Sequence, residues 1–341
     1  MKIAVLCGGL SNERDVSISS GTCIARALRE RGHAVALIDL FLGCESEGGV
    51  DGLFTSEERD GAFSVAEAAP DLAQVRAMRP GQGLIGPGVM EACSAADIVF
   101  LALHGDEGEN GKLQAVLDVH GVRYTGSGYL GSALAMDKSL TKTVLSQAGI
   151  RMPGGVTVHK NQKPYDNPGF PCVVKPCSGG SSVGTTIVHG PEEYAAALEL
   201  AFRYEDSVIA ETYIAGRELT VGVLDGKAMP VIEIIPKSGF YDYKNKYQPG
   251  MTVELCPAPI TEAETENVQR LAEETYRALR LEAYGRVDFI MDADGVCWCL
   301  EANTLPGFTP TSLVPQMGVA MGLSYGELCE RLIAASLKKY E

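Results

Sequence analysis

Residues 2–17 read KIAVLCGGLSNERDVS and decide the fold of the first third of the chain. Residues 2–7 are apolar enough for a buried strand, the two glycines allow a tight turn, and residues 15–31 have helical spacing. A strand leading directly into a helix predicts a parallel sheet with helical crossovers. The helix start suits a carboxylate or phosphate, and Glu13 could hold an ammonium group. The turn could equally serve packing, and Glu13 could merely complement the helix dipole.

The alternation of strand and helix continues to about residue 135. Strands are predicted at 34–40 and 97–103, and a helix at 112–120. Residues 43–88 are rich in Gly, Glu and Ala and have weak periodicity, so we expect an elaborated surface connection without an assigned function. These features predict an α/β domain over residues 1–135.

The pattern changes from residue 136. A predicted helix at 138–148 leads to Pro153, which restricts the residue before it and favours a boundary. Short strands and one helix at 192–202 follow, and the last third has two helices, at 263–279 and 325–337. The strands are expected at 172–175, 184–188, 208–212, 218–224, 229–235, 286–291 and 296–302. We expect a central unit over 136–220 and a C-terminal unit over 221–341, both α+β.

Composition limits the classes of function. The 341 residues are too many for one ordinary core, so two or three domains are expected. The net charge of −15 argues against nucleic acid or an anionic membrane as the main partner. The ten cysteines lack CxxC spacing, which favours free thiols in a reducing compartment. The apolar start is too short for a signal peptide and no run is long enough to span a membrane, so we expect a cytoplasmic protein.

Two stretches carry the chemistry of phosphate and metal binding. In residues 171–184, PCVVKPCSGGSSVG, a strand ends in Lys175 and a loop of small residues follows, which suits backbone N–H bonds to phosphate better than a plain hairpin turn does. Arg286 and Asp288 share one face of a predicted strand, as do Glu301 and Asn303 on the next. If the strands pair antiparallel, Asp288, Glu301 and Asn303 converge as hard oxygen ligands for Mg²⁺. A structural cross-strand network is the alternative.

Three further segments are candidates for binding. Residues 239–250, GFYDYKNKYQPG, are bounded by glycines and rich in Tyr and Lys, which suits a mobile lid over an anionic ligand; an exposed loop is the alternative. Residues 303–313 form another turn rich in donors. His104 follows a strand and opens a helix, where it could be functional or simply packed. GxSxG and HExxH are absent, so hydrolase triads and zinc chemistry are disfavoured.

Taken together, these segments resemble the ATP-grasp superfamily and, within it, the D-alanine–D-alanine ligase family. The resemblance runs nearly end to end, and its specificity comes from the order and separation of the segments. They read GGLSNERDVS, LHGDEGENG, YTGSGYLGSALAMDKSLTK, VVKPCSGGSSVG, ETYIAGRELTVGVL, GFYDYKNKYQPG, GRVDFIM and LEANTLPGFTPTSLVP. It implies a three-domain architecture with a Rossmann-like substrate-binding domain (1–135), a central ATP-grasp subdomain (136–220) and a C-terminal domain (221–341) that contains the lid.

The resemblance also implies roles for individual residues. Those for ATP are Lys138 and Lys175 at the phosphates, Glu211, Ile214 and Glu218 at adenine and ribose, and Lys246 at the γ-phosphate. Asp288, Glu301 and Asn303 match the ligands of two Mg²⁺ ions, which Mn²⁺ could replace. Glu13 would bind the ammonium of the first D-alanine with His104 nearby, and Ser181 and Tyr247 would tie Glu13 to the lid. Arg286 and the Gly307 amide would stabilise the tetrahedral intermediate, and Ser312 and Leu313 would form the second D-alanine pocket.

The implied activity is ATP-dependent synthesis of D-alanyl-D-alanine through a D-alanyl phosphate, for peptidoglycan precursors, by a homodimer. Two positions depart from the family pattern: Gly179 replaces a common Glu, and Thr212 replaces a common basic residue beside adenine. Ligation of D-serine or D-lactate is the nearest alternative, and Tyr247 favours D-alanine. Another ATP-grasp carboxylate–amine ligase and a nucleotide-binding regulator without turnover are the remaining alternatives.

Overall fold

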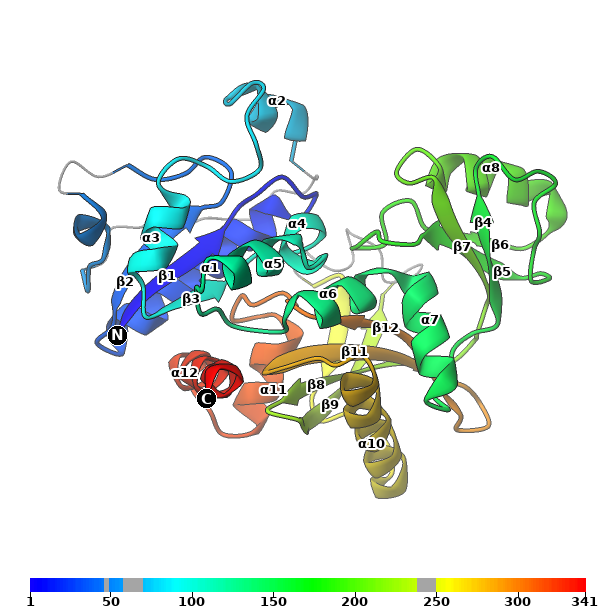
Figure 1. Cartoon of the computed structure of the whole chain (residues 1–341). Helices are drawn as coiled ribbons and strands as arrows, with labels where there is room; N and C mark the ends of the chain where they lie inside the picture. Colours follow the sequence, from blue (N-terminus) through cyan, green and yellow to red (C-terminus); the bar gives the residue numbers. More distant parts are fainter. Residues whose placement is uncertain (46–48, 58–69, 238–249) are drawn as a thin grey trace.

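The computed structural model describes residues 1–45, 49–57, 70–237 and 250–341. Three sheets organise the chain, and Figure 1 places the N-terminal sheet and the central sheet at opposite ends of the molecule. The C-terminal sheet lies between them.

The N-terminal sheet is parallel, as its βαβ pattern predicts. Its strands have the order β2-β1-β3, and α1 packs on β1 and β2. The elements of this unit are β1 (Lys2–Cys7), α1 (Arg14–Glu30), β2 (Ala34–Asp39), α3 (Val89–Ala95), β3 (Ile98–Leu101), α4 (Asp106–Glu109) and α5 (Lys112–Val119). The buried pattern of β1 follows from its apolar run, since parallel strands are covered on both faces.

The turn after β1 is fixed by an ion pair between a buried arginine and a partly buried aspartate. The Arg14 guanidinium contacts the Asp39 carboxylate, and it also donates to the Gly9 carbonyl at 2.6 Å. Asp39 in turn accepts the backbone N–H groups of Phe41 and Leu42, each at 2.9 Å. Gly8 has a φ of 74°, and a Cβ built there would lie 2.3 Å from an Asp39 carboxylate oxygen. Only glycine therefore fits beneath the ion pair.

The central sheet is antiparallel, with the order β4-β7-β5-β6, and α8 packs against β5 and β6. Its elements are β4 (Gly155–His159), β5 (Cys172–Pro176), β6 (Thr186–Val188), α8 (Pro191–Ala201) and β7 (Ser207–Thr212). A small core between the helix and the sheet, which includes Val174, Leu198 and Ala210, holds the unit together. The loop between β5 and β6 contains the Gly- and Ser-rich stretch.

The C-terminal sheet is also antiparallel, with the order β10-β9-β8-β11-β12, and α10 packs on β8, β9 and β11. Its elements are β8 (Arg217–Leu224), β9 (Lys227–Pro236), β10 (Thr252–Leu255), α10 (Glu262–Ala278), β11 (Tyr284–Met291) and β12 (Cys297–Asn303). α7 (Lys138–Gln147) shares this core through Leu145. The expected boundary at 220/221 falls inside β8, which pairs with both β9 and β11.

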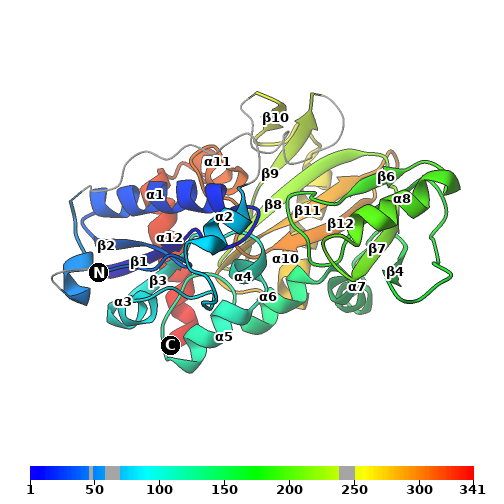
Figure 2. The same ribbon diagram turned by 90° about the horizontal axis from the view of Figure 1, so that it is seen from above.

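The last helices return to the N-terminal unit. α11 (Leu313–Ala320) packs on β9, and α12 (Tyr325–Leu337), followed by the short η2 (Lys338–Tyr340), packs on α1. Arg31 donates to Glu330 at 2.6 Å across this contact. Both termini lie at the end of the molecule formed by the N-terminal sheet, as Figures 1 and 2 show. The N-terminal unit and part of the C-terminal sheet therefore share one continuous core with the last helices, whereas the central unit has its own core.

Glu109, at the end of α4, joins the N-terminal unit to the loop after β12. Its carboxylate accepts the N–H groups of Thr304 at 3.1 Å, Leu305 at 2.9 Å and Gly105 at 2.8 Å. Burial and, to a smaller extent, the neighbouring Glu13 charge raise the pKa of Glu109 to about 7. The backbone N–H donors have the opposite, smaller effect on this pKa.

The predicted strands and helices are present, with ends shifted by a few residues. Elements without a clear period were not predicted: α6 (Tyr129–Met136), β4, β10, α11, and the short η1 (Val50–Leu53), α2 (Leu72–Ala77), α3, α4 and η2. η1 and α2 lie in the region 43–88 that was expected to be a surface connection, and residues 46–48 and 58–69 of it lie outside the description. All ten cysteines are free thiols, as expected.

We predict that Gly8→Ala destabilises the protein by about 3 kcal/mol, from a left-handed backbone penalty plus overpacking against Asp39. Gly32→Ala is the matched control, because Gly32 also has a positive φ but nothing lies within 4 Å of its added Cβ. Its cost should stay at about 1 kcal/mol. Urea unfolding measures both, and equal losses would contradict the role of the ion pair.

We predict that Glu109 makes stability depend on pH. Its pKa is 4.5 in the unfolded chain and about 7 in the folded protein, so its contribution is full below the lower value and is lost as pH rises through the higher one. The advantage of wild type over Glu109→Gln in urea unfolding should therefore be larger at about pH 6 than at about pH 8. Glu264→Gln is the control, because the lowered pKa of Glu264 lies outside this window. An advantage equal at both pH values would contradict the prediction.

Candidate active site

Two cavities meet where the three units face one another. The first has a volume of about 370 Å³ and lies against the N-terminal unit, β12 and the loop before α11. Among the residues that line it are Glu13, His104, Arg286, Asn303, Gly307, Ser312 and Leu313. Polar and charged groups from distant segments therefore line one cavity.

The second cavity, of about 190 Å³, lies between the central and C-terminal sheets. Lys175, Glu211, Ile214, Glu218 and Asp288 are among its lining residues. The two cavities have a common wall made of Lys138, Gly179, Gly180, Ser181 and Glu301. Molecules bound in the two cavities would approach each other at this wall.

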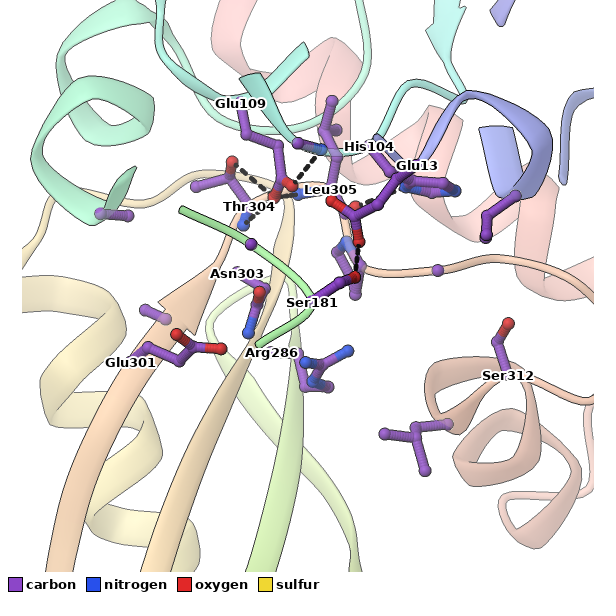
Figure 3. A pocket seen from close by; sticks show the side chains of 18 of the residues that line it. Glu13, His104, Glu109, Ser181, Arg286, Glu301, Asn303, Thr304, Leu305 and Ser312 are labelled. Carbon is purple, nitrogen blue, oxygen red and sulfur yellow. Dashed lines mark hydrogen bonds between the residues drawn. The ribbon is translucent and has the colours of Figure 1, made fainter. Parts of the chain in front are cut away.

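Glu13 and Ser181 connect the N-terminal and central units at the common wall. Glu13 is the residue before α1, and the Ser181 hydroxyl donates to its carboxylate, as Figure 3 shows. Ser181 and Ser182 have φ values of 49° and 58°, a left-handed conformation that few non-glycine residues adopt. The loop is therefore bent so that its tip reaches across to Glu13.

Asp288 is the centre of a network on the C-terminal sheet. β11 and β12 pair antiparallel, which places Asp288 directly opposite Glu301 and Arg286 opposite Asn303. The Asp288 carboxylate accepts from Arg286 at 2.8 and 2.9 Å, from Thr220 at 2.6 Å and from the Asn303 amide at 3.0 Å. Two carboxylates and an amide oxygen, all hard donors, therefore lie beside the common wall.

Lysines pair with two of the carboxylates that line the second cavity. Lys175 lies 2.7 Å and Lys142 2.8 Å from the Glu211 carboxylate, and Lys138 lies 3.3 Å from Glu301. Burial favours neutral Lys175, but Glu211 and Glu301 outweigh it and raise the pKa of Lys175. Burial likewise favours neutral Glu211, but the two lysines hold its pKa below the usual value. Lys175 thus stays protonated, although the cavity wall around it also contains carboxylates.

His104 is buried behind Glu13 as a neutral side chain. Its Nδ1 lies 2.8 Å from the Leu305 carbonyl oxygen and its Nε2 lies 2.9 Å from the Ser20 hydroxyl. The carbonyl can only accept, which assigns the proton to Nδ1. Burial, helped by the Arg286 charge, lowers the pKa of His104 against the opposing effects of Glu13 and Leu305.

The far wall of the first cavity is the turn before α11. Ser312 is the residue before this helix, and its hydroxyl accepts the Thr309 N–H at 3.0 Å. A Cβ added to Gly307 would lie 3.3 Å from the Ser312 hydroxyl, so the backbone approaches closely. Leu313 is buried beside them. In Figure 3, Ser312 lies on the opposite side of the view from Glu301.

The described site residues predicted from sequence all line one cavity or the other, whereas Lys246 and Tyr247 lie outside the described residues. Sequence reasoning missed Glu109, Lys142 and Thr220, which hold other site residues in place. Glu109 lies within the quoted segment LHGDEGENG, the only signal that pointed toward it. Within the described ranges, no group of three or more His, Cys, Asp or Glu side chains could hold a metal ion. No helix in those ranges could cross a membrane.

Comparisons with known proteins cover nearly the whole chain. The family described as "D-ala D-ala ligase N-terminus" matches residues 2–127, and "D-ala D-ala ligase C-terminus" matches residues 147–334. A D-alanine–D-alanine ligase of Pediococcus pentosaceus is 44% identical, covering 100% of this chain and 99% of its own. One from Lacticaseibacillus casei is 45% identical, with coverages of 100% and 97%.

A solved structure extends the comparison to the fold. The D-alanine–D-alanine ligase of Bacillus anthracis complexed with ATP superposes with a TM-score of 0.77 at 30% identity. The match covers 99% of this chain and 98% of that one. The ATP-grasp architecture expected from the sequence is thereby confirmed. On this family match and these relatives, the chain belongs to the D-alanine–D-alanine ligase family.

Proposed function

We propose that this protein joins two D-alanine molecules into D-alanyl-D-alanine and converts ATP to ADP and phosphate, for peptidoglycan precursor synthesis. The observation that carries the proposal is the common wall of the two cavities, where Lys138, Ser181 and Glu301 border both. A nucleotide in the second cavity would direct its γ-phosphate at an amino-acid carboxylate in the first. The identity of the substrates is inferred from membership of the family.

On the nucleotide side, Lys138 and Lys175 would hold the phosphates, and the bent loop around Ser181 would donate its N–H groups. Glu211, Ile214 and Glu218, which also line the second cavity, would bind adenine and ribose. Thr212 is not basic, so one adenine contact would come from the backbone alone. Lys246 on the lid would reach the γ-phosphate.

Asp288, Glu301 and Asn303 would hold Mg²⁺, or Mn²⁺ in its place. Their donors are the carboxylate and amide oxygens that these hard cations prefer, and they lie beside the wall where the phosphates would end. Bound metal would neutralise charge on the transferred phosphoryl oxygens. Arg286 currently neutralises the Asp288 carboxylate, and metal would take over part of that role.

On the amino-acid side, Glu13 would bind the ammonium of the first D-alanine, with neutral His104 behind it. Ser312 and Leu313 would bind the second D-alanine on the far wall. The carboxylate of the first D-alanine attacks the γ-phosphoryl group, ADP leaves, and a D-alanyl phosphate forms. The free amine of the second then attacks the acyl carbon, phosphate leaves, and the nitrogen loses its proton.

Arg286 and the Gly307 amide would stabilise the oxyanion that forms during the second step. The contact between Ser181 and Glu13 joins the phosphate loop to the amino-acid site, and Tyr247 would extend it to the lid. The lid predicted at residues 239–250 lies, apart from residue 250, outside the described residues; its closure would exclude water from the acyl phosphate.

We propose three domains as given by the sequence, with the division between the last two moved from 220/221 to residues 213–216, ahead of β8. We also propose a cytoplasmic homodimer, on the resemblance and the free cysteines.

The direct test supplies purified protein with ATP, Mg²⁺ and D-alanine and measures phosphate release and dipeptide by mass spectrometry. We expect D-alanyl-D-alanine and equal amounts of phosphate. L-alanine, D-serine and D-lactate mixtures run alongside. If product formed only with D-serine or D-lactate as acceptor, that acceptor and not D-alanine would be the second substrate. Absence of turnover with all of them would refute the ligase proposal.

We predict that Glu301→Gln lowers kcat about 100-fold and raises the Mg²⁺ concentration needed for half-maximal rate, because a carboxylate beside Lys138 and opposite Asp288 is lost. Asp294→Asn is the matched control, since Asp294 lies exposed in the turn joining the same two strands. Phosphate release is measured against MgCl₂. A variant with wild-type rate and Mg²⁺ dependence would remove Glu301 from the metal site.

A further inference from the structure

The loop between β5 and β6, residues 177–185, is held at its start by a residue outside both cavities. The Ser178 N–H donates to one Glu205 carboxylate oxygen at 2.8 Å, and the Ser178 hydroxyl donates to the other at 3.0 Å. Glu205 follows α8 and lines neither cavity. Hydrogen bonds to a carboxylate are about twice as strong as neutral ones, so the start of the loop is firmly fixed.

The end of the same loop is held by the residue next to Glu205. Gly184 has a φ of 73°, and a Cβ built there would lie 2.8 Å from Cδ2 of the Tyr204 ring and 3.2 Å from Cγ of Pro176. The Tyr204 ring therefore lies against the Gly184 backbone. Glu205 therefore contacts the start of the loop, and the neighbouring Tyr204 contacts its end.

The middle of the loop has a conformation that needs this support. Ser181 and Ser182 are both left-handed, which costs a non-glycine residue about 1 kcal/mol or more each. Lys138 donates to the Gly179 carbonyl at 2.7 Å, and the Val183 N–H donates to the Gly180 carbonyl at 3.1 Å. A loop of small residues has little side-chain packing of its own to keep this shape.

We propose that Glu205 is a positioning residue for nucleotide binding, acting through Ser178 to keep the phosphate loop folded. The inference rests on the proposed function and adds to it a residue that touches neither nucleotide nor amino acid. Without the hydrogen bonds between Glu205 and Ser178, the loop must be ordered by the nucleotide itself. That ordering weakens binding and leaves the chemistry of the bound complex nearly unchanged. The expected signature is a raised KM for ATP with little change in kcat.

The test compares Glu205→Ala, Glu205→Gln and Asp206→Ala with wild type. Glutamine can keep both bonds, accepting the Ser178 N–H through its oxygen and donating to the Ser178 hydroxyl through its nitrogen. Asp206 is the adjacent acid, and its side chain is 80% exposed. Calorimetry with a non-hydrolysable ATP analogue and Mg²⁺ gives Kd without D-alanine, and steady-state kinetics gives KM and kcat.

We expect Glu205→Ala to raise Kd and the KM for ATP about tenfold, with kcat within about threefold of wild type. Glu205→Gln should stay within about threefold of wild type in every constant, and Asp206→Ala should be unchanged. Should Glu205→Ala fail to fold, Ser178→Ala removes one of the two bonds and should raise Kd about threefold.

The proposed role of Glu205 would be refuted if Glu205→Ala bound the ATP analogue with wild-type affinity. It would also be refuted if Glu205→Ala and Glu205→Gln lost affinity equally. In the second case the charge of Glu205, and not its hydrogen bonds, would matter. If the wild-type protein bound the analogue but formed no dipeptide, only the proposed function would be refuted. The Kd values of the variants would still decide whether Glu205 supports nucleotide binding.

Discussion

The antiparallel pairing of β11 with β12 is the constraint on which the rest of the site depends. It sets Asp288 opposite Glu301 and Arg286 opposite Asn303, so acids and their cation share one face. Two carboxylates this close repel unless positive charge lies between them. Arg286 and Lys138 supply that charge here. The proposed metal ions would supply more of it where the substrate phosphates would lie.

The three units contribute what no one of them could hold alone. Glu13 comes from the N-terminal unit, Ser181 from the central loop, and their hydrogen bond closes the gap between the two. Glu109 ties the first unit to the loop after β12. The left-handed backbone of Ser181 and Ser182 and the burial of the Glu109 carboxylate each cost free energy. They persist because several contacts hold each of these residues in place.

Sequence reasoning succeeded where the deciding signal was local. The apolar run ending in Gly8-Gly9 gives β1 and its turn, and the two-residue spacing of Arg286 and Asp288 gives their shared face. It failed for α11, whose residues are mostly buried and lack a polar stripe, and for β4, where only Val158 is buried. Glu109 bonds to Thr304 across 195 positions, a contact that no local pattern encodes.

The central claim is that a carboxylate at the common wall attacks the γ-phosphoryl group of ATP. The most direct measurement uses D-alanine whose carboxylate carries heavy oxygen and determines the mass of the phosphate released as dipeptide forms. An acyl phosphate requires one labelled oxygen to pass from the first D-alanine into each phosphate. Unlabelled phosphate, or label in AMP, would contradict the proposed geometry of attack.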